Sequence, residues 1–579
     1  MFSRNRSLAR LRSEHFDLVV IGGGITGAGV ALDAASRGLR TALIERDDFA
    51  SGTSSKSSKM VHGGLRYLQQ GDVALVREAL VERHRLLRNA PHLVRPLPFV
   101  LPMFAKGGMV PAKIARALGG AMWAYDAAGG WRVGHLHRHL DVQETVGFVP
   151  CIRPESIAGG YLYWDAAADD ARLTLAVCRT ASLHHGAVVA NRVRAVGIER
   201  NEQGSACGVL IEADGDRCTV STSAVVNAAG VWADAIHRFE DDDLAETIRP
   251  ARGVHVSVPR ELVPTSVAAI LPVRGDRRSV FVVPQGDIAY IGTTDTDDDG
   301  PLDDPRCTPD DIAYLLGAVN AATTAQLEPS DVLGTWAGLR PLVRTASSSR
   351  TADMSRGHRV DRSEAGVVTV IGGKLTTYRR MAADAVDEVV RHVLGPSAPT
   401  GSRRCRTASL ALRGAADFDT VEAAAHRFGV PAHTARHLAD RYGGEARAVM
   451  ELLVEDPALA RPLVDGLPYL AAEAVFAVRA EMATSVDDVL SRRTRARLFA
   501  RDAAAGAADD IAQLIAPDLG WTANEAAASA AEFRALCEHE RETGELPPTV
   551  RRRDERRDTH PGDAAPAGAP PSDRRTSHD

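Results

Sequence analysis

The sequence predicts an α/β fold over its first 395 residues and an all-helical region after them. Three observations support this prediction. A strand–glycine–helix–strand unit occupies residues 17–45, a second strand–glycine–helix junction occupies residues 367–379, and helical periodicity follows the turn-rich stretch 395–402. Alternating strand and helix patterns indicate an α/β domain, and a change of pattern beyond Gly and Pro residues indicates a domain boundary.

The first unit has the order of a nucleotide-binding βαβ unit. Leu18–Ile21 is a short apolar run with the β-branched content of a buried strand. The glycine-rich turn Gly22-x-Gly24-x-x-Gly27 follows this strand, and an Ala-rich helix is predicted over residues 27–37. A second strand, Thr41–Ile44, leads directly to the acidic residue Glu45.

Each of these small residues has a physical role. Gly22 allows the tight turn, Gly24 lets the backbone approach a pyrophosphate, and Gly27 lets the helix and strand pack closely. The helix N-terminus offers N–H groups and a positive dipole end to phosphates. Glu45, 21 positions beyond Gly24, is placed to accept hydrogen bonds from a ribose. Glycines alone could mark an ordinary turn, but the whole unit predicts a bound dinucleotide.

The composition is that of a soluble globular protein. The chain has 579 residues, of which 45% are hydrophobic and 25% charged, so we expect two or three domains. A net charge of −6 gives no indication of nucleic-acid binding. The seven cysteines include no C-x-x-C pair, which predicts no metal site and suggests a reducing compartment. No apolar run is long enough to predict a membrane-spanning helix.

Composition also predicts the order of segments. Residues 1–15 form a basic N-terminal arm, either solvated or in contact with anionic lipid, and 16–395 form the α/β region. Residues 396–405 form a linker, 406–545 a helical domain and 546–579 a disordered charged tail. The helical domain contains four candidate helices: 421–428, 432–442, 446–454 and 469–484.

Two later regions favour FAD over NAD as the dinucleotide. Residues 51–59 are rich in Ser and Thr, which suits a ligand that continues beyond the pyrophosphate into a polyol. Residues 224–230 form a strand that ends in small residues, and the strand 367–373 leads into a helix that starts near Lys374. N–H groups at that helix start could face a flavin pyrimidine edge, where negative charge develops when a hydride is accepted.

With these motifs the sequence resembles the FAD-dependent glycerol-3-phosphate dehydrogenase family. The similarity extends over nearly the whole chain except its ends. Its most specific segments are His-Gly-Gly-Leu-Arg-Tyr at 62–67 and Gly-Gly-Lys-Leu-Thr-Thr-Tyr at 372–378. The other matching segments are 21–29, 53–61, 164–173, 291–295, 338–342, 473–481 and 492–495.

The resemblance implies a fold and an activity. The fold would be a Rossmann-type FAD-binding domain with an interleaved mixed-sheet substrate domain, plus the helical C-terminal domain. The reaction would oxidise sn-glycerol 3-phosphate to dihydroxyacetone phosphate by hydride transfer from C2 to flavin N5, with electrons passed to a membrane quinone. The enzyme would be cytoplasmic and peripherally associated with the inner face of the cytoplasmic membrane. A homodimer is compatible with the sequence, which does not fix the oligomeric state.

The resemblance also implies site residues. For the substrate they are Arg66, Tyr67, Arg340, Arg356 and Lys374. Arg gives planar bidentate contacts to phosphate and Lys a point charge. For FAD they are Gly22, Gly24, Gly27, Glu45, Thr53, Ser54, Ser58, Val193, Ala229, Gly230, Leu375, Thr376 and Thr377.

The chemistry needs a base for the C2 hydroxyl proton. His255 lies in the alternating segment 252–258 and matches a family histidine, although most strand histidines are simply packed. Arg340 would stabilise the developing alkoxide, and Lys374 belongs to the same catalytic group. His62 could contact the flavin or make a structural hydrogen bond.

Membrane contact is predicted for residues 103–123. Positions 110, 114, 117, 118, 121 and 122 fall on one helical face beside Lys113 and Arg116, with Trp123 following. Such a stripe suits an interfacial helix, but the residues alone favour ordinary core packing. The resemblance implies membrane contact instead, because membrane-associated members of the family use a comparable region.

Three alternative functions remain open from the sequence. They are an oxidase that returns electrons to oxygen as hydrogen peroxide, an amine or amino-acid oxidase of the same flavoprotein class, and a flavin-dependent regulator without catalysis.

Overall fold

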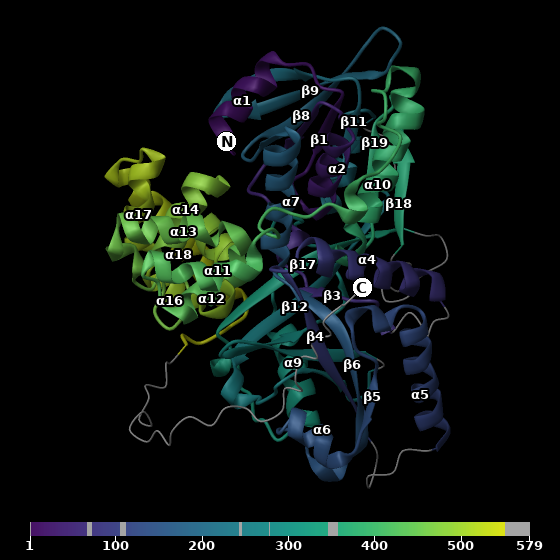
Figure 1. Ribbon diagram of the computed structural model, residues 1–579, viewed down its shortest axis with the longest axis vertical. Coiled ribbons are helices and arrows are strands. Elements are labelled where there is room, and N and C mark those ends of the chain that lie inside the picture. Colours follow the sequence, from purple (N-terminus) through teal and green to yellow (C-terminus); the bar gives the residue numbers. More distant parts are fainter. Residues whose placement is uncertain are drawn as a thin grey trace, which may run out of the picture.

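The structure is a computed structural model that describes residues 2–65, 72–104, 112–241, 246–276, 278–344 and 357–549. Figure 1 shows three bodies: one sheet with its helices above, a larger sheet below, and a group of helices at one side. Of the described helices, none combines the length and apolar content needed to cross a bilayer.

The first body is a six-stranded sheet in the order β18-β19-β11-β1-β2-β7. All neighbours are parallel except β18 and β19. The strands are β1 (Leu18–Ile21), β2 (Thr41–Ile44), β7 (Val188–Ala190), β11 (Val225–Asn227), β18 (His358–Arg362) and β19 (Val368–Gly372). The predicted strands 18–21 and 41–44 are confirmed, and the helix between them, α2 (Ile25–Ser36), begins two residues before Gly27.

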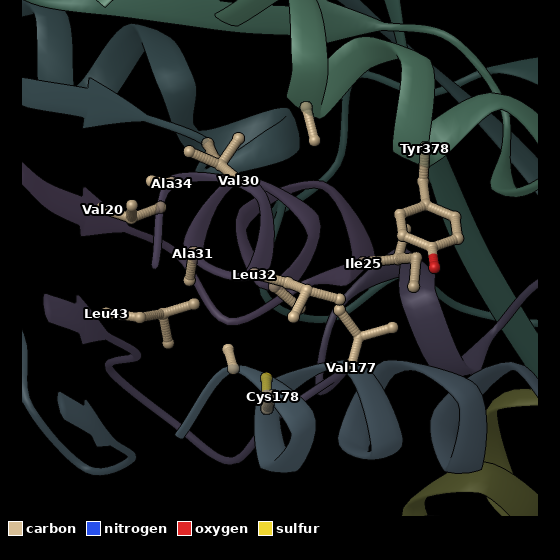
Figure 2. Packing of buried hydrophobic residues seen from close by; sticks show 14 of the residues in the cluster. Val20, Ile25, Val30, Ala31, Leu32, Ala34, Leu43, Val177, Cys178 and Tyr378 are labelled. Carbon is tan, nitrogen blue, oxygen red and sulfur yellow. The ribbon is translucent and has the colours of Figure 1, made fainter. Parts of the chain in front are cut away.

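Two further helices pack on α2 and complete the core of this body. Val20 and Leu43 point from the strands toward Val30, Ala31 and Ala34 of α2 (Figure 2). α7 (Asp170–His185) and α10 (Tyr378–Glu388) contact α2 on its other sides. A three-stranded sheet lies beside this body and consists of β8 (Arg194–Arg200), β9 (Ala206–Ala213) and β10 (Asp216–Ser221).

The second body is a ten-stranded mixed sheet in the order β16-β12-β15-β14-β13-β4-β6-β3 plus β17 on β12 and β5 on β6. Its strands come from chain segments between β2 and β7 and between β11 and β18, so the two bodies are interleaved as predicted. The strands are β3 (Met60–Val61), β4 (Val94–Phe104), β5 (Arg138–Leu140), β6 (Ile157–Ala168), β12 (Ile248–Pro259), β13 (Ala268–Pro272), β14 (Ser279–Gln285), β15 (Ile288–Gly292), β16 (Thr296–Asp297) and β17 (Gly334–Val343). The helices that pack on it include α4 (Val73–Asn89), α5 (Ala112–Ala127), α6 (Val142–Phe148) and α9 (Pro309–Ala322).

The third body is helical and packs around Ile511 and Phe533. Its helices are α11 (Val421–Ala424), α12 (Ala432–Tyr442), α13 (Ala446–Glu455), α14 (Ala471–Glu481), α15 (Ala496–Phe499), α16 (Arg501–Gly506), α17 (Ala508–Leu519) and α18 (Ala523–Thr543). The four candidate helices correspond to α11 with the turn after it, α12, α13 and α14, with shifted ends at the last two.

The chain ends differ from the expectation. Residues 4–13 are not a solvated arm but the helix α1 (Arg4–Ser13), whose Leu8 and Leu11 are buried. Arg4 donates to the carbonyls of Asn191 and Arg192. Sequence reasoning weighed the arginines of this segment and overlooked the two leucines on one helical face.

Residues 546–549, the start of the predicted disordered tail, are packed against the protein. Leu546 is 3% exposed and packs in the core of the second body. The N–H of Thr549 donates to Asp502 at 2.6 Å. Residues 550–579, the rest of that prediction, lie outside the described residues.

Candidate active site

A cavity of about 310 Å³ lies at the carboxyl ends of β1, β2, β11 and β19. This is where open α/β sheets bind ligands. Among the predicted cofactor residues, those that line it are Gly22, Gly24, Glu45, Thr53, Ser54, Val193, Ala229, Gly230 and Leu375.

The turn between β1 and α2 requires glycine. Gly22 has φ of +111°, and a Cβ there would lie 2.7 Å from the carbonyl oxygen of Ala228. A Cβ on Gly27 would lie 1.9 Å from the carbonyl oxygen of Gly22. Gly24 precedes α2 and supplies no capping side chain, so the helix N-terminus can receive a pyrophosphate. The geometry therefore fits the dinucleotide predicted from the spacing.

Glu45 sits at the end of β2 on the cavity wall. Its Oε2 accepts from the Gly23 N–H at 2.6 Å and its Oε1 from the Asp47 N–H at 2.8 Å. Burial raises the pKa of Glu45 to about 7, and the two backbone donors only partly offset that effect. Hydroxyl donors from a ribose would stabilise the same carboxylate further.

Three other cofactor candidates have partners in the protein. Ser54 Oγ accepts from the Ile25 N–H at 2.9 Å and so lies at the start of α2. Thr53 Oγ1 donates to the Leu339 carbonyl at 2.5 Å. The Val193 N–H donates to the Glu45 carbonyl at 2.8 Å, so Val193 lies beside the end of β2.

The far end of the cavity is a single turn, Leu375–Thr377, that leads into α10. Leu375 and Lys374 line the cavity, whereas Thr376 and Thr377 point into the protein. Thr376 Oγ1 accepts from the His62 N–H at 3.1 Å and donates to the His62 carbonyl at 3.3 Å. The side chain of Thr376 thus holds the backbone of the segment that leads to Arg66.

His255 is buried in the second sheet between two neighbouring strands. Its register partners are Trp336 on β17 and Gly292 on β15. The imidazole stacks on the Trp336 ring with centroids 5.0 Å apart and planes 7° apart. A Cβ on Gly292 would lie 2.0 Å from His255 Cδ2, so only glycine leaves room for the ring.

His255 is held as a neutral imidazole. Burial lowers its pKa well below the ordinary value, and the cations Lys59 and Arg340 lower it further. Its Nε2 lies 2.8 Å from Ser58 Oγ, which connects the imidazole to the segment that borders the cofactor cavity. Its Nδ1 is buried and has no hydrogen-bond partner within the part of the chain that the structure describes.

Arg340 lies on β17 and pairs with Asp295 at 2.9 Å. Its guanidinium also donates to Thr293 Oγ1 at 3.2 Å and to the Thr294 carbonyl at 3.1 Å. The segments 291–295 and 338–342 therefore form one cluster. The sequence did not predict that Asp295 would partly neutralise Arg340.

Three predicted substrate residues, Arg66, Tyr67 and Arg356, lie outside the described residues. The start of the segment that carries the first two is anchored by Asp165. Its Oδ1 accepts from the Gly63 N–H at 3.1 Å and from the Tyr125 hydroxyl at 2.7 Å.

Sequence reasoning missed Lys59 and Trp336 behind His255. One signal was available: Trp336 and Arg340 are four positions apart on one strand, so both side chains lie on the same face. The pairing of that strand with the strand of His255 could not be read from the sequence.

Comparison with known proteins agrees with this geometry. A sequence family described as FAD dependent oxidoreductase matches residues 17–372, and one described as the C-terminal domain of alpha-glycerophosphate oxidase matches residues 405–526. A crystal structure of the glycerol-3-phosphate dehydrogenase from Bacillus halodurans, complexed with FAD, superposes with a TM-score of 0.76 at 30% identity. That match covers 94% of this chain and 98% of the other.

Relatives are similar along most of their length. Glycerol-3-phosphate dehydrogenase 2 of Mycobacterium tuberculosis is 41% identical over 92% of this chain and 89% of its own. The human mitochondrial glycerol-3-phosphate dehydrogenase is 35% identical over 90% of this chain and 73% of its own. The chain is therefore an FAD-dependent oxidoreductase and belongs to the glycerol-3-phosphate dehydrogenase family.

Proposed function

We propose that the enzyme oxidises sn-glycerol 3-phosphate at C2 to dihydroxyacetone phosphate and passes the electrons to a membrane quinone. The observation that carries the proposal is the pair His255 and Arg340, a buried imidazole and a guanidinium on the adjacent strands β12 and β17. Oxidation of a secondary alcohol needs a proton acceptor and a cation near the developing alkoxide. The names of the relatives support the substrate.

We assign the following roles to the residues of this chain. FAD, when bound, supplies the hydride acceptor at N5. His255 takes the C2 hydroxyl proton, which a neutral imidazole can do and an imidazolium cannot. Arg340 stabilises negative charge on the C2 oxygen, and Lys374, on the cavity wall, is a cation for the substrate. We assign Arg66, Tyr67 and Arg356 to the substrate phosphate on the family resemblance.

Rapid anaerobic mixing with glycerol 3-phosphate tests this assignment. His255→Gln should slow flavin reduction by about 100-fold or more, because general-base catalysis contributes about that factor. The dissociation constant of the substrate should change much less. His392→Gln, which alters a half-exposed histidine on another surface, is the matched control. Flavin reduction at the normal rate in His255→Gln would remove the base assignment.

The second candidate on the same fold is an oxidase that takes electrons from glycerol 3-phosphate and returns them to oxygen as hydrogen peroxide. An amine or amino-acid oxidase would instead need the arginines for a substrate carboxylate. We expect this enzyme to turn over with a soluble quinone analogue and to form little hydrogen peroxide in air. Rapid peroxide formation without quinone would indicate the oxidase, and reduction by amino acids in a substrate panel would indicate the third class.

Membrane contact belongs to this proposal, but through a different surface from the predicted stripe. Met122 is fully buried in a core cluster, so the described end of the stripe is core. Trp123, the next residue, is 62% exposed, and Trp131 and Leu136 in the following segment are 55% and 53% exposed. Indole rings at a surface are typical of membrane interfaces. We place the membrane surface at these three side chains.

Flotation with anionic liposomes tests this surface. The wild type should float, and Trp123→Ser with Trp131→Ser should reduce the floating fraction several-fold because two interfacial anchors are lost. Val454→Ser is the control, since Val454 is 57% exposed on the helical domain. A wild-type protein that stays at the bottom contradicts membrane contact.

A further inference from the structure

A buried cation lies behind the proposed base. The Lys59 side chain is 8% exposed, and its Nζ donates to the Ser55 carbonyl at 3.2 Å and to Asp170 Oδ1 at 3.3 Å. The same Nζ lies 4.8 Å from the centre of the Trp336 ring. Burial of an ammonium is costly unless it is paired, and a cation over an indole face is favourable.

Trp336 joins this cation to the base. Its side chain is buried, and its indole N–H donates to the Ser57 carbonyl at 3.1 Å, which fixes the ring. Its ring contacts both the Lys59 ammonium and the His255 imidazole. With Gly292 as the other register partner of His255, the imidazole plane has little freedom to turn.

The charges around His255 are two cations and the carboxylates that bind them. Lys59 is bound by Asp170, which also pairs with Arg495 of the helical domain. Arg340 is bound by Asp295. Tyr290 on β15 adds a neutral phenol whose hydroxyl donates to the Ser58 carbonyl at 3.1 Å. Within the described residues, no carboxylate forms a hydrogen bond or ion pair with His255 itself, so both cations act on an imidazole that has no counter-charge in direct contact.

We propose that Trp336 and Lys59 are positioning residues for the reaction: Trp336 fixes the plane of the His255 imidazole, and Lys59 keeps that imidazole uncharged and ready to accept a proton. The proposal rests on the proposed role of His255 as base. Lys59 does not line the cofactor cavity, so it acts through the histidine.

The role of the positive charge of Lys59 is tested by comparing the variants Lys59→Gln and Lys59→Arg. Glutamine keeps an N–H donor for Ser55 and Asp170 but removes the charge, whereas arginine keeps the charge. A cation lowers the pKa of a nearby imidazole, so its loss raises that pKa. The acid limb of the flavin-reduction rate should therefore move up by about one pH unit in Lys59→Gln and stay at the wild-type position in Lys59→Arg. Coincident profiles of the two variants would overturn the proposal.

The stack is tested separately, which keeps the proposal falsifiable if Lys59→Gln loses FAD. Trp336→Phe keeps an aromatic face and should slow flavin reduction by no more than about tenfold, whereas Trp336→Leu should slow it by about a further tenfold at unchanged substrate affinity. Equal rates in the two variants would reject the role of the stack.

The His255→Gln variant separates this proposal from the proposed function. If it reduces flavin at the wild-type rate, the base is wrong and this proposal is wrong with it. A second outcome is that His255→Gln reduces flavin slowly while Lys59→Gln matches Lys59→Arg and Trp336→Phe matches Trp336→Leu. In that case only the roles of Lys59 and Trp336 are rejected.

Discussion

At the scale of single residues, much of the cofactor site follows from the sequence and little of the catalytic site does. Gly22 has φ of +111°, and Gly27 packs against the Gly22 carbonyl; both features lie within one βαβ unit, so spacing alone predicts them. The environment of His255 depends on Trp336 and Gly292, which reach it from two other strands. Contacts of that kind need the register of the sheet, and no local pattern specifies register between distant strands.

Gly292 offers a sharp test of this packing. A methyl group there would lie 2.0 Å from His255 Cδ2, so Gly292→Ala should displace the imidazole. We expect at least a tenfold loss in the rate of flavin reduction with FAD retained. Gly197→Ala is the control, because its Cβ would meet only the Leu210 side chain at 3.6 Å. Full activity in Gly292→Ala would show that the position of the ring does not matter.

Glu45 predicts a pH dependence of cofactor binding. Burial raises its pKa to about 7 without the cofactor, and ribose hydroxyls favour the ionised form. Ionisation is therefore linked to binding: FAD affinity is highest above pH 7 and falls by up to about tenfold per pH unit below it. Fluorescence titration of apoprotein between pH 5.5 and 8.5 measures this. Glu45→Gln should bind more weakly at high pH and lose the dependence, and an unchanged profile would contradict the role.

At the scale of elements, strands and helices with strong local patterns were predicted well. β1 and β2 match the predicted ranges because a fully buried strand is a continuous apolar run. The stripe on α5 was assigned to either membrane or core, and only the structure shows that Met122 is core. An apolar helical face indicates burial without naming what covers it.

Buried ion pairs join the helical domain to the cofactor-binding loops. Asp48 lies just beyond β2 and pairs with Arg492 at 2.6 Å and Arg493 at 2.7 Å. Burial alone would raise the pKa of Asp48, but the two arginines hold it below its ordinary value. The pair therefore stabilises the fold above the pKa that Asp48 has when unfolded, and this contribution is lost as the pH falls through the lower folded value.

Asp48→Asn should break this junction. Removal of the Asp48 carboxylate leaves Arg492 paired with Asp487 and Asp488, and Arg493 with Glu481 at 3.8 Å. Breaking a buried ion pair costs about 3–5 kcal/mol, and we expect the lower end of that range because these partners remain. We expect a lower free energy of unfolding and faster loss of FAD, because the loop next to Glu45 loosens. Asp518→Asn is the control, since its pair with Arg479 is half-exposed and worth little. Equal denaturation curves for the two variants would show that Asp48 does not hold the domains together.

At the scale of the whole molecule, the chain builds one site from three bodies. The first sheet supplies the cofactor cavity, the second supplies His255 and Arg340, and the helical domain reaches Asp170 through Arg495. The resemblance to the glycerol-3-phosphate dehydrogenase family predicted the interleaving, which the structure confirms. The sequence could not predict the function of the helical domain, because its contacts with the other bodies include ion pairs between residues more than 300 positions apart.

The central claim is that the bound FAD takes electrons from glycerol 3-phosphate. Anaerobic titration of the purified holoenzyme, followed by the loss of flavin absorbance, tests it most directly. Stoichiometric addition of sn-glycerol 3-phosphate should bleach the flavin fully, while glycine or sarcosine at the same concentration should leave it oxidised. A flavin that stays oxidised with glycerol 3-phosphate, or that is bleached by the amino acids instead, would contradict the account.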